Sequence, residues 1–99
     1  MRKKDMARAL GSYDLDRISP SEYPYILRSL GVLRWDGSVS IVHLKLLHQA
    51  LIHTIVPEEV WERGPEGVEP LLMANTGSTR LLGYVDDLWR EYNGEEQKA

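Results

Sequence analysis

The chain has 99 residues, of which 42% are hydrophobic and 27% are charged, and its formal net charge is −3. This size and composition are typical of one globular domain with a modest core. Cysteine is absent, which excludes disulfides, thiolate metal sites and cysteine nucleophiles. No segment has the apolar length of a signal peptide or a membrane span, so we expect a cytoplasmic protein.

Charge is distributed unevenly along the chain. Residues 1–56 carry eight Lys/Arg and five Asp/Glu, whereas residues 57–99 carry four and ten. The basic excess lies at the N-terminus, so we expect a basic, mobile arm over residues 1–12. A weak helical segment lies within it, from Lys3 to Leu10, and offers Met6, Ala7 and Leu10 as contacts.

The next helix is predicted from Pro20 to Leu30. Ser19 suits the N-cap, Pro20 the first helical position, and Gly31 the left-handed position after the last turn. The apolar face of this helix comprises Tyr23, Ile26, Leu27 and Leu30. Asp36-Gly37 then predicts either a plain turn or a short β-hairpin over residues 32–41. In the hairpin, a two-residue turn would pair Trp35 with Ser38 and Arg34 with Val39.

The dominant feature is the hydrophobic segment from Ser40 to Val56, which contains no glycine or proline. Its helical periodicity places one broad apolar face on Ile41, Leu44, Leu47, Leu51, Ile52 and Ile55. Further apolar residues fall outside that face: Val42, Leu46, Ala50 and Val56. Because a helix that is hydrophobic on most sides needs cover on most sides, this segment is predicted to be the centre of the fold.

Pro57 ends the central helix, and a short helix with Glu58 and Glu59 in its first turn is expected to follow. After a Gly/Pro-rich loop, an amphipathic helix is predicted from Ser78 or Thr79 to Asn93, with Asp86 and Arg90 paired one turn apart. Its apolar face comprises Leu81, Leu82, Tyr84, Val85, Leu88, Trp89 and Tyr92. Residues 94–99 are expected to form a disordered acidic tail.

The predicted fold is therefore a mainly α, single-domain helical bundle over residues 1–99 around the central helix at about 40–56. Only the second and last helices offer broad apolar faces as cover. The uncovered part of the central helix, near Val42, Leu46 and His53, predicts a partner or self-association. Trp35 and Trp61 lie on short elements, and we treat both as candidate hot spots of a protein interface.

Few residues are arranged for catalysis. His43, His48 and His53 are spaced by five, so they point in different directions on one helix and cannot share a metal ion. His48 falls on the apolar face, where we expect a core histidine bonded to a backbone carbonyl or a buried carboxylate. We identify no metal site, cofactor or small-molecule ligand.

The leading hypothesis is a non-enzymatic protein-interaction module, such as a small adaptor, assembly factor or regulatory subunit, that self-associates or joins a larger complex. The alternative is a nucleic-acid-binding transcriptional regulator with a helix–turn–helix-like pair and a basic arm. Its contacts would be Arg2, Lys3, Lys4, Arg8, Arg28, Arg34 and Lys45. A third hypothesis is a small enzyme that uses His48 as a base.

Overall fold

Helices account for most of residues 2–98, which are the residues that the computed structural model describes, with side chains through Tyr92. In chain order they are α1 (Lys3–Gly11), the 3₁₀ turn η1 (Pro20–Glu22), α2 (Tyr23–Ser29), α3 (Ile41–Ile55), α4 (Glu58–Glu62), the 3₁₀ turn η2 (Pro65–Gly67), α5 (Val68–Met73) and α6 (Gly77–Lys98). The predicted mainly helical, single-globule class is confirmed. None of these helices is long and apolar enough to cross a membrane.

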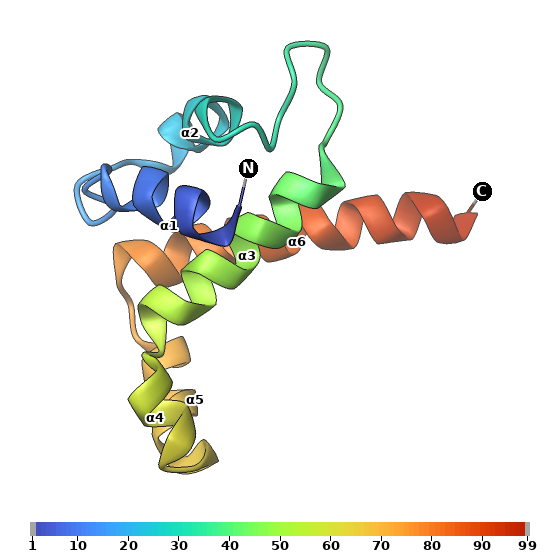
Figure 1. Ribbon diagram of the computed structural model, residues 1–99. Coiled ribbons are helices and arrows are strands. Elements are labelled where there is room, and N and C mark those ends of the chain that lie inside the picture. The colour runs from blue at the N-terminus through green and yellow to red at the C-terminus, as the bar shows by residue number, and fades with distance from the viewer. Residues whose placement is uncertain (1, 99) are drawn as a thin grey trace.

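The central helix α3 organises the fold, as predicted. Ser40 is its N-cap and Val56 its C-cap, so the boundaries expected from the sequence are confirmed. Leu44, Leu47 and Leu51 are completely buried. α6 and α1 pack against α3 more extensively than any other elements do (Figure 1).

The N-terminal segment, for which a basic, mobile arm is predicted over residues 1–12, contributes two side chains to the core. Met6 is 0% exposed and Leu10 is 3% exposed. These two residues lie one turn apart, so both project from α1 onto the rest of the core. α1 thereby covers the side of α3 that carries Ala50, which is buried although it lies outside the predicted apolar face.

The second helix is divided, because a 3₁₀ turn precedes α2. Pro24 therefore lies in the first turn of α2, where its missing N–H leaves no hydrogen bond unmade. After the helix, Gly31 has φ of 81°, and the Val32 N–H donates to the Leu27 carbonyl at 2.8 Å. This is the left-handed ending that the sequence predicts.

The predicted hairpin is absent from the described residues, and one antiparallel bridge between Leu33 and Val39 takes its place. The Arg34 N–H donates to the Ser38 carbonyl at 2.9 Å, so the loop has three residues and the expected register is wrong by one. Two features favour the longer loop. Gly37 ends it with φ of 86°, and the Asp36 carboxylate accepts the Ser38 N–H at 2.9 Å and its hydroxyl at 2.6 Å.

The last helix differs from the prediction at both ends. It begins at Gly77, after Thr76 and Thr79 exchange side-chain and backbone hydrogen bonds in a reciprocal cap. At the other end the backbone stays helical through Lys98, past the expected stop at Asn93-Gly94. A single glycine costs a helix only about 1 kcal/mol, which a long helix tolerates.

A small lobe extends from the C-terminal end of α3 and consists of α4, η2 and α5 (Figure 1). Val68 is its buried residue. The Trp61 indole N–H donates to the Val56 carbonyl at 3.1 Å, which ties the lobe to the end of α3. We call residues 57–73 the acidic lobe below, because they contain five glutamates and one arginine.

Candidate functional site

One stripe of α3 stays open between α1 and α6. Val42, Leu46, Gln49 and His53 follow each other at helical spacing, so they share this side. Val42 is 67% exposed and His53 is exposed, whereas Leu46 is half-buried against the core. The three residues predicted to meet a partner therefore lie together on one surface of α3.

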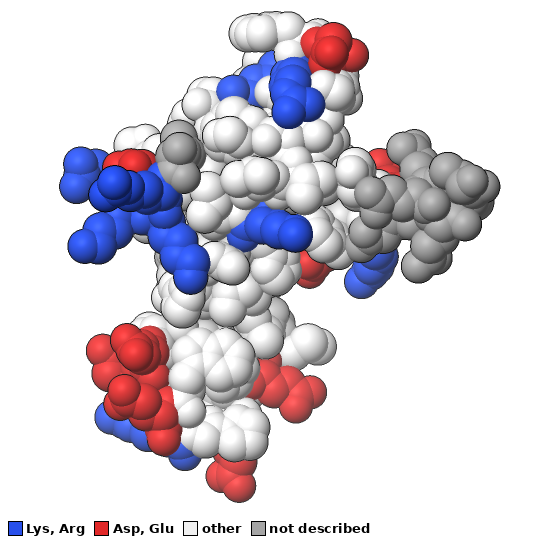
Figure 2. All heavy atoms as spheres, turned by 45° about the vertical axis from the view of Figure 1, so that its right-hand side comes forward, with Lys and Arg blue, Asp and Glu red and all other residues white. Residues whose placement is uncertain are grey.

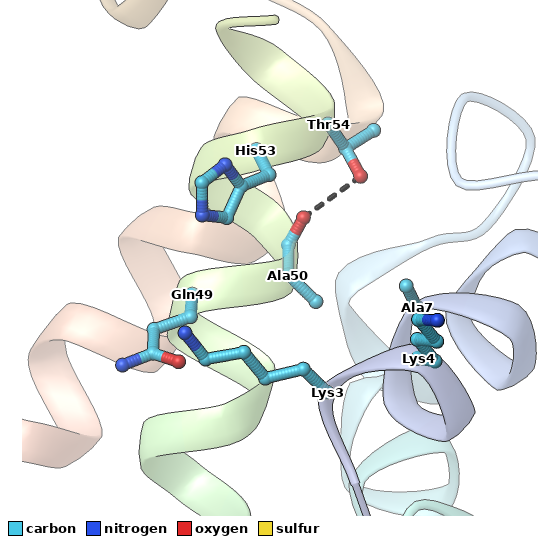
Figure 3. A pocket seen from close by; sticks show the side chains of 7 residues that line it. All are labelled: Lys3, Lys4, Ala7, Gln49, Ala50, His53 and Thr54. Atoms are coloured by element: carbon cyan, nitrogen blue, oxygen red, sulfur yellow. Dashed lines mark hydrogen bonds between the residues drawn. The ribbon is translucent and has the colours of Figure 1, made fainter. Parts of the chain in front are cut away.

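A hollow of about 290 Å³ lies on one flank of this stripe, between α1 and α3. The lining residues are Lys3, Lys4 and Ala7 from α1 and Gln49, Ala50, His53 and Thr54 from α3 (Figure 3). Ala7 and Ala50 leave space where larger side chains would fill the gap between the helices. The Thr54 hydroxyl donates to the Ala50 carbonyl at 2.8 Å, so this polar group is satisfied within its own helix.

The rim of the hollow is basic. Lys3 and Lys4 are exposed, and Lys3 extends from α1 toward α3 (Figure 3). Neither lysine forms an ion pair within residues 2–92. Both occupy the first turn of α1, where the helix dipole favours acids and disfavours cations. Neither lysine therefore gains stability from the dipole of its own helix.

Arg2 and Arg8 extend this basic group, against one acidic neighbour in the same helix. That neighbour, Asp5, accepts the Arg2 backbone N–H at 3.1 Å and so caps the helix. Figure 2 shows the basic side chains of α1 and the acidic side chains of the lobe as two separate groups on one face. We call Arg2, Lys3, Lys4 and Arg8, together with the hollow beside them, the basic hollow.

A second hollow, of about 300 Å³, lies between α3 and α6 and is lined by Lys45, His48, Gln49 and Trp89. The Lys45 ammonium lies 5.9 Å from the centroid of the Trp89 ring. This separation is at the limit of a cation–π contact. Trp89 is half-buried and packs on the core from its edge.

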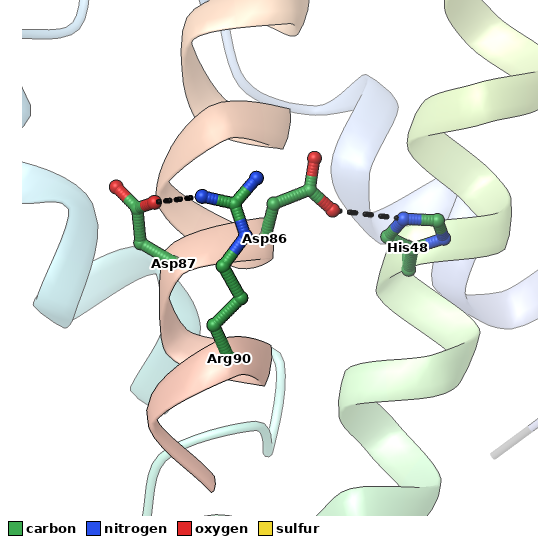
Figure 4. A network of polar contacts seen from close by, with 4 residues as sticks. All are labelled: His48, Asp86, Asp87 and Arg90. Atoms are coloured by element: carbon green, nitrogen blue, oxygen red, sulfur yellow. Dashed lines mark hydrogen bonds and ion pairs between the residues drawn. The ribbon is translucent and has the colours of Figure 1, made fainter. Parts of the chain in front are cut away.

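His48 is not the core histidine expected from its position in the sequence. Its Nε2 lies 3.1 Å from Asp86 Oδ1, and the two side chains are 42% and 41% exposed (Figure 4). The pair bridges α3 and α6 at the edge of their contact. The partner of His48 is therefore a partly exposed carboxylate, and not the backbone carbonyl or buried carboxylate that was expected. Arg90 pairs with Asp87 at 3.6 Å instead of with the predicted Asp86.

The His48–Asp86 pair resembles only one half of a catalytic arrangement. A carboxylate can orient a histidine base, but nucleophilic catalysis also needs a hydroxyl or thiol within hydrogen-bond reach of that base. The described side chains place no hydroxyl in a hydrogen bond with His48. In the same part of the chain, no three His, Asp or Glu side chains are grouped closely enough to hold a metal ion.

The two tryptophans proposed as hot spots lie at opposite ends of α3. Trp35 is 86% exposed at the tip of the turn that leads into α3, and Trp61 is 46% exposed in the acidic lobe. The Arg28 guanidinium carbon lies 5.3 Å from the centroid of the Trp35 ring and 5.9 Å from that of Tyr25. Neither tryptophan belongs to the open stripe of α3, so each marks a separate surface.

The residues proposed to contact nucleic acid fall into three groups. One is on α1, one comprises Arg28 and Arg34 at the turn, and one is Lys45 alone on α3. α2 and α3 do not form the helix–turn–helix-like pair expected around Arg28, Arg34 and Lys45. Residues 30–40 separate α2 from α3, whereas that motif uses a turn of about three or four residues, and α3 is largely occupied by core contacts.

The turn surrounds the Asp36 carboxylate with groups that stabilise its charge. The Asp36 carboxylate accepts hydrogen bonds from the Ser38 hydroxyl, which has the larger effect, and from the Ser38 backbone N–H. These bonds lower the pKa of Asp36 below its ordinary value. The positive charge of Arg34 acts in the same direction. Asp36 therefore stays ionised to more acidic pH than a free aspartate does.

Ala7, Gln49, Ala50 and Thr54 were missed as site residues by sequence reasoning. Lys3 and Lys4 were identified only as contacts for nucleic acid. The sequence pattern that could have indicated the hollow is one alanine on each helix, Ala7 and Ala50, with Lys3 and Lys4 one turn from Ala7. This pattern can be interpreted only once α1 is known to pack on α3.

Comparison with models of known protein families, with curated proteins and with solved structures found no match.

Proposed function

We propose that this chain is a non-enzymatic protein-interaction module, a small adaptor, assembly factor or regulatory subunit, that binds an acidic partner segment in the basic hollow. A cytoplasmic location is part of the proposal. The single observation that carries it is the basic rim around an alanine-floored hollow, on a helix whose first turn disfavours cations. Apolar lining with a few charged groups is the usual composition of a recognition site.

The hollow also limits the form of the partner. About 290 Å³ is at the lower end of the range for binding pockets, so it fits one large apolar side chain. Lys3 and Lys4 would contact carboxylates on either side of that anchor. Because such contacts lie at a solvent-exposed rim, they would mainly set binding rate and specificity, while burial of the anchor would supply the affinity.

The test is a titration of the isotope-labelled full chain with a short synthetic peptide of glutamates around one tryptophan, followed by NMR. We expect amide shifts at Ala7, Ala50 and Thr54 that saturate and that weaken as salt is added. The matched control is the same peptide with lysine in place of glutamate. Shifts that are absent, or equal for both peptides, would show that the basic hollow does not select an acidic segment.

A second candidate function, binding to single-stranded nucleic acid, is supported by a different surface. Trp35 presents an exposed ring beside Arg28 and Arg34, and aromatic rings next to cations are typical platforms for stacked bases. We expect binding of a labelled oligothymidine to weaken with salt and to weaken further in Trp35→Ala, with Trp61→Ala as control. No salt-dependent binding, or an equal effect of both substitutions, would exclude this function.

A further inference from the structure

We propose that the basic hollow of one molecule receives the acidic lobe of a second copy of this chain. This inference rests on the proposed function and names its partner. The lobe has the chemistry that the hollow requires. Five exposed glutamates surround it, with one arginine among them: Glu58, Glu59, Glu62, Glu66 and Glu69. None of the five forms an ion pair within residues 2–92.

The lobe also carries exposed apolar side chains that could serve as anchors. Trp61 is 46% exposed and Met73 is 78% exposed. The indole N–H of Trp61 is held by the Val56 carbonyl at 3.1 Å, so the ring is already oriented. A pre-ordered aromatic anchor loses little conformational freedom on binding, which is the property of interface hot spots.

The shape of the chain makes this contact intermolecular. The acidic lobe extends from the C-terminal end of α3 (Figure 1). The basic hollow lies between α1 and α3. No residue of the lobe lines the hollow. The unpaired glutamates and lysines of one molecule therefore remain apart, and they can neutralise each other when a second molecule presents its lobe to the hollow.

The contact joins two different surfaces. Two copies that exchange lobes reciprocally form a closed, isologous dimer, whereas heterologous contacts between successive copies close as a ring or continue as a chain. All of these assemblies share the same contact between lobe and hollow. Because that contact is between exposed charges at its rim, association is expected to weaken as the Debye length falls from about 10 Å at 0.1 M salt to about 3 Å at 1 M.

The experiment uses two charge-reversed variants of the full chain, each studied by sedimentation velocity over a range of concentrations. The hollow variant carries Lys3→Glu and Lys4→Glu, and the lobe variant carries Glu62→Lys and Glu66→Lys. Each variant loses the charge complementarity between its own hollow and lobe, because the substitutions cancel the net charge of the surface that carries them. Self-association should therefore weaken more than about tenfold relative to the natural chain. An equimolar mixture brings the natural hollow of the lobe variant together with the natural lobe of the hollow variant, so association should be restored through that one contact.

Unfolding does not explain the expected losses. Acids at the first turn of α1 interact favourably with the helix dipole, so the hollow variant should fold at least as well as the natural chain. All four substituted residues are exposed. The control matched to the hollow variant, Arg34→Glu with Arg80→Glu, lowers the net charge by the same amount at exposed positions outside both surfaces, and it should retain self-association.

Three results would overturn the inference: a natural chain that stays monomeric at high concentration in low salt, a hollow variant that still associates, or a mixture that fails to recover. If any of these occurs while the glutamate–tryptophan peptide still shifts Ala50 and Thr54, the partner is wrong and the proposed function stands. If the peptide produces no shift and the mixture does not associate, the proposed function fails as well.

Discussion

Gly77→Ala tests the closest backbone approach in the fold. Gly77 begins α6, and its N–H donates to the Asp16 carboxylate at 2.7 Å. A Cβ added at this position would lie 2.5 Å from the backbone nitrogen of Asp16 and closer still to the carbonyl group of Leu15. Because these atoms belong to the backbone, no side chain can rotate away, and α6 must shift by about 1 Å to reach an ordinary contact distance.

The magnitude follows from three contributions. Overpacking costs about 1–3 kcal/mol, and a weakened hydrogen bond to a carboxylate costs up to about 2 kcal/mol, less where Asp16 is solvated. Alanine offsets part of this through its greater helix propensity, by up to about 1 kcal/mol. We therefore expect Gly77→Ala to lower the free energy of unfolding by about 1–4 kcal/mol, which for a domain of this size lowers Tm by at least about 4 °C.

Gly83→Ala in the same helix is the matched control. An added Cβ there has no atom within 4 Å, so only propensity changes and the free energy of unfolding should rise by about 0.5–1 kcal/mol. Urea denaturation followed by far-UV circular dichroism measures both variants. Asp16→Ala removes the acceptor without adding an atom to α6. If Gly77→Ala costs no more than Asp16→Ala, the backbone approach is not the cause and the reasoning is refuted.

Other predictions address the core, the interhelical pair and the turn. Met6→Ala should lower the free energy of unfolding by about 2–5 kcal/mol, while Arg8→Ala should change it by less than about 0.5 kcal/mol. Equal effects of the two substitutions in denaturation curves would show that α1 does not pack on the core. Asp86→Asn should cost less than about 1 kcal/mol because the ion pair is partly solvated, and a loss twice as large would contradict that exposure. The pKa of Asp36 is lowered, so its ionised form stabilises the turn above the ordinary aspartate pKa, and this contribution disappears as pH falls through the lowered value. The NMR shift of the Ser38 amide should report this titration, and a midpoint at or above the ordinary aspartate value would contradict it.

Local signals made the boundaries of α3 predictable. Ser40 occupies the N-cap position, where its hydroxyl bonds to His43 Nδ1 at 2.7 Å instead of to a free backbone N–H. Pro57 follows the last turn, and its missing N–H ends the helix, so both boundary signals act within a few residues. Gly31 was predictable for the same reason, because only glycine readily adopts its positive φ. The turn at Asp36-Gly37 was predicted in kind but not in register. The hydrogen bonds from Ser38 to Asp36 add one residue to the loop, and a dipeptide signal contains no information about them.

The packing of α1 could not be predicted because its signal is weak. Met6 and Leu10 are its only completely or almost completely buried residues, in a segment dominated by charge. Their contribution depends on α3 presenting Ala50 at the matching position, which is a property of the tertiary structure. The basic hollow depends on the same docking, since its floor combines Ala7 of one helix with Ala50 of the other. The sequence therefore indicated an open side of α3 without locating the hollow beside it.

Folding stability and the proposed association use different faces of the same helix. α1 contributes Met6 and Leu10 to the core, while Lys3 and Lys4 remain in solvent on the rim of the basic hollow. Substitutions on one face should leave the other unaffected, so association can be abolished without loss of fold. Charge is also divided along the chain, because residues 1–56 carry a basic excess and residues 57–99 an acidic excess. Since the hollow contains no residue of its own lobe, the two groups can neutralise each other between molecules, and this should oppose the repulsion that a net charge of −3 produces.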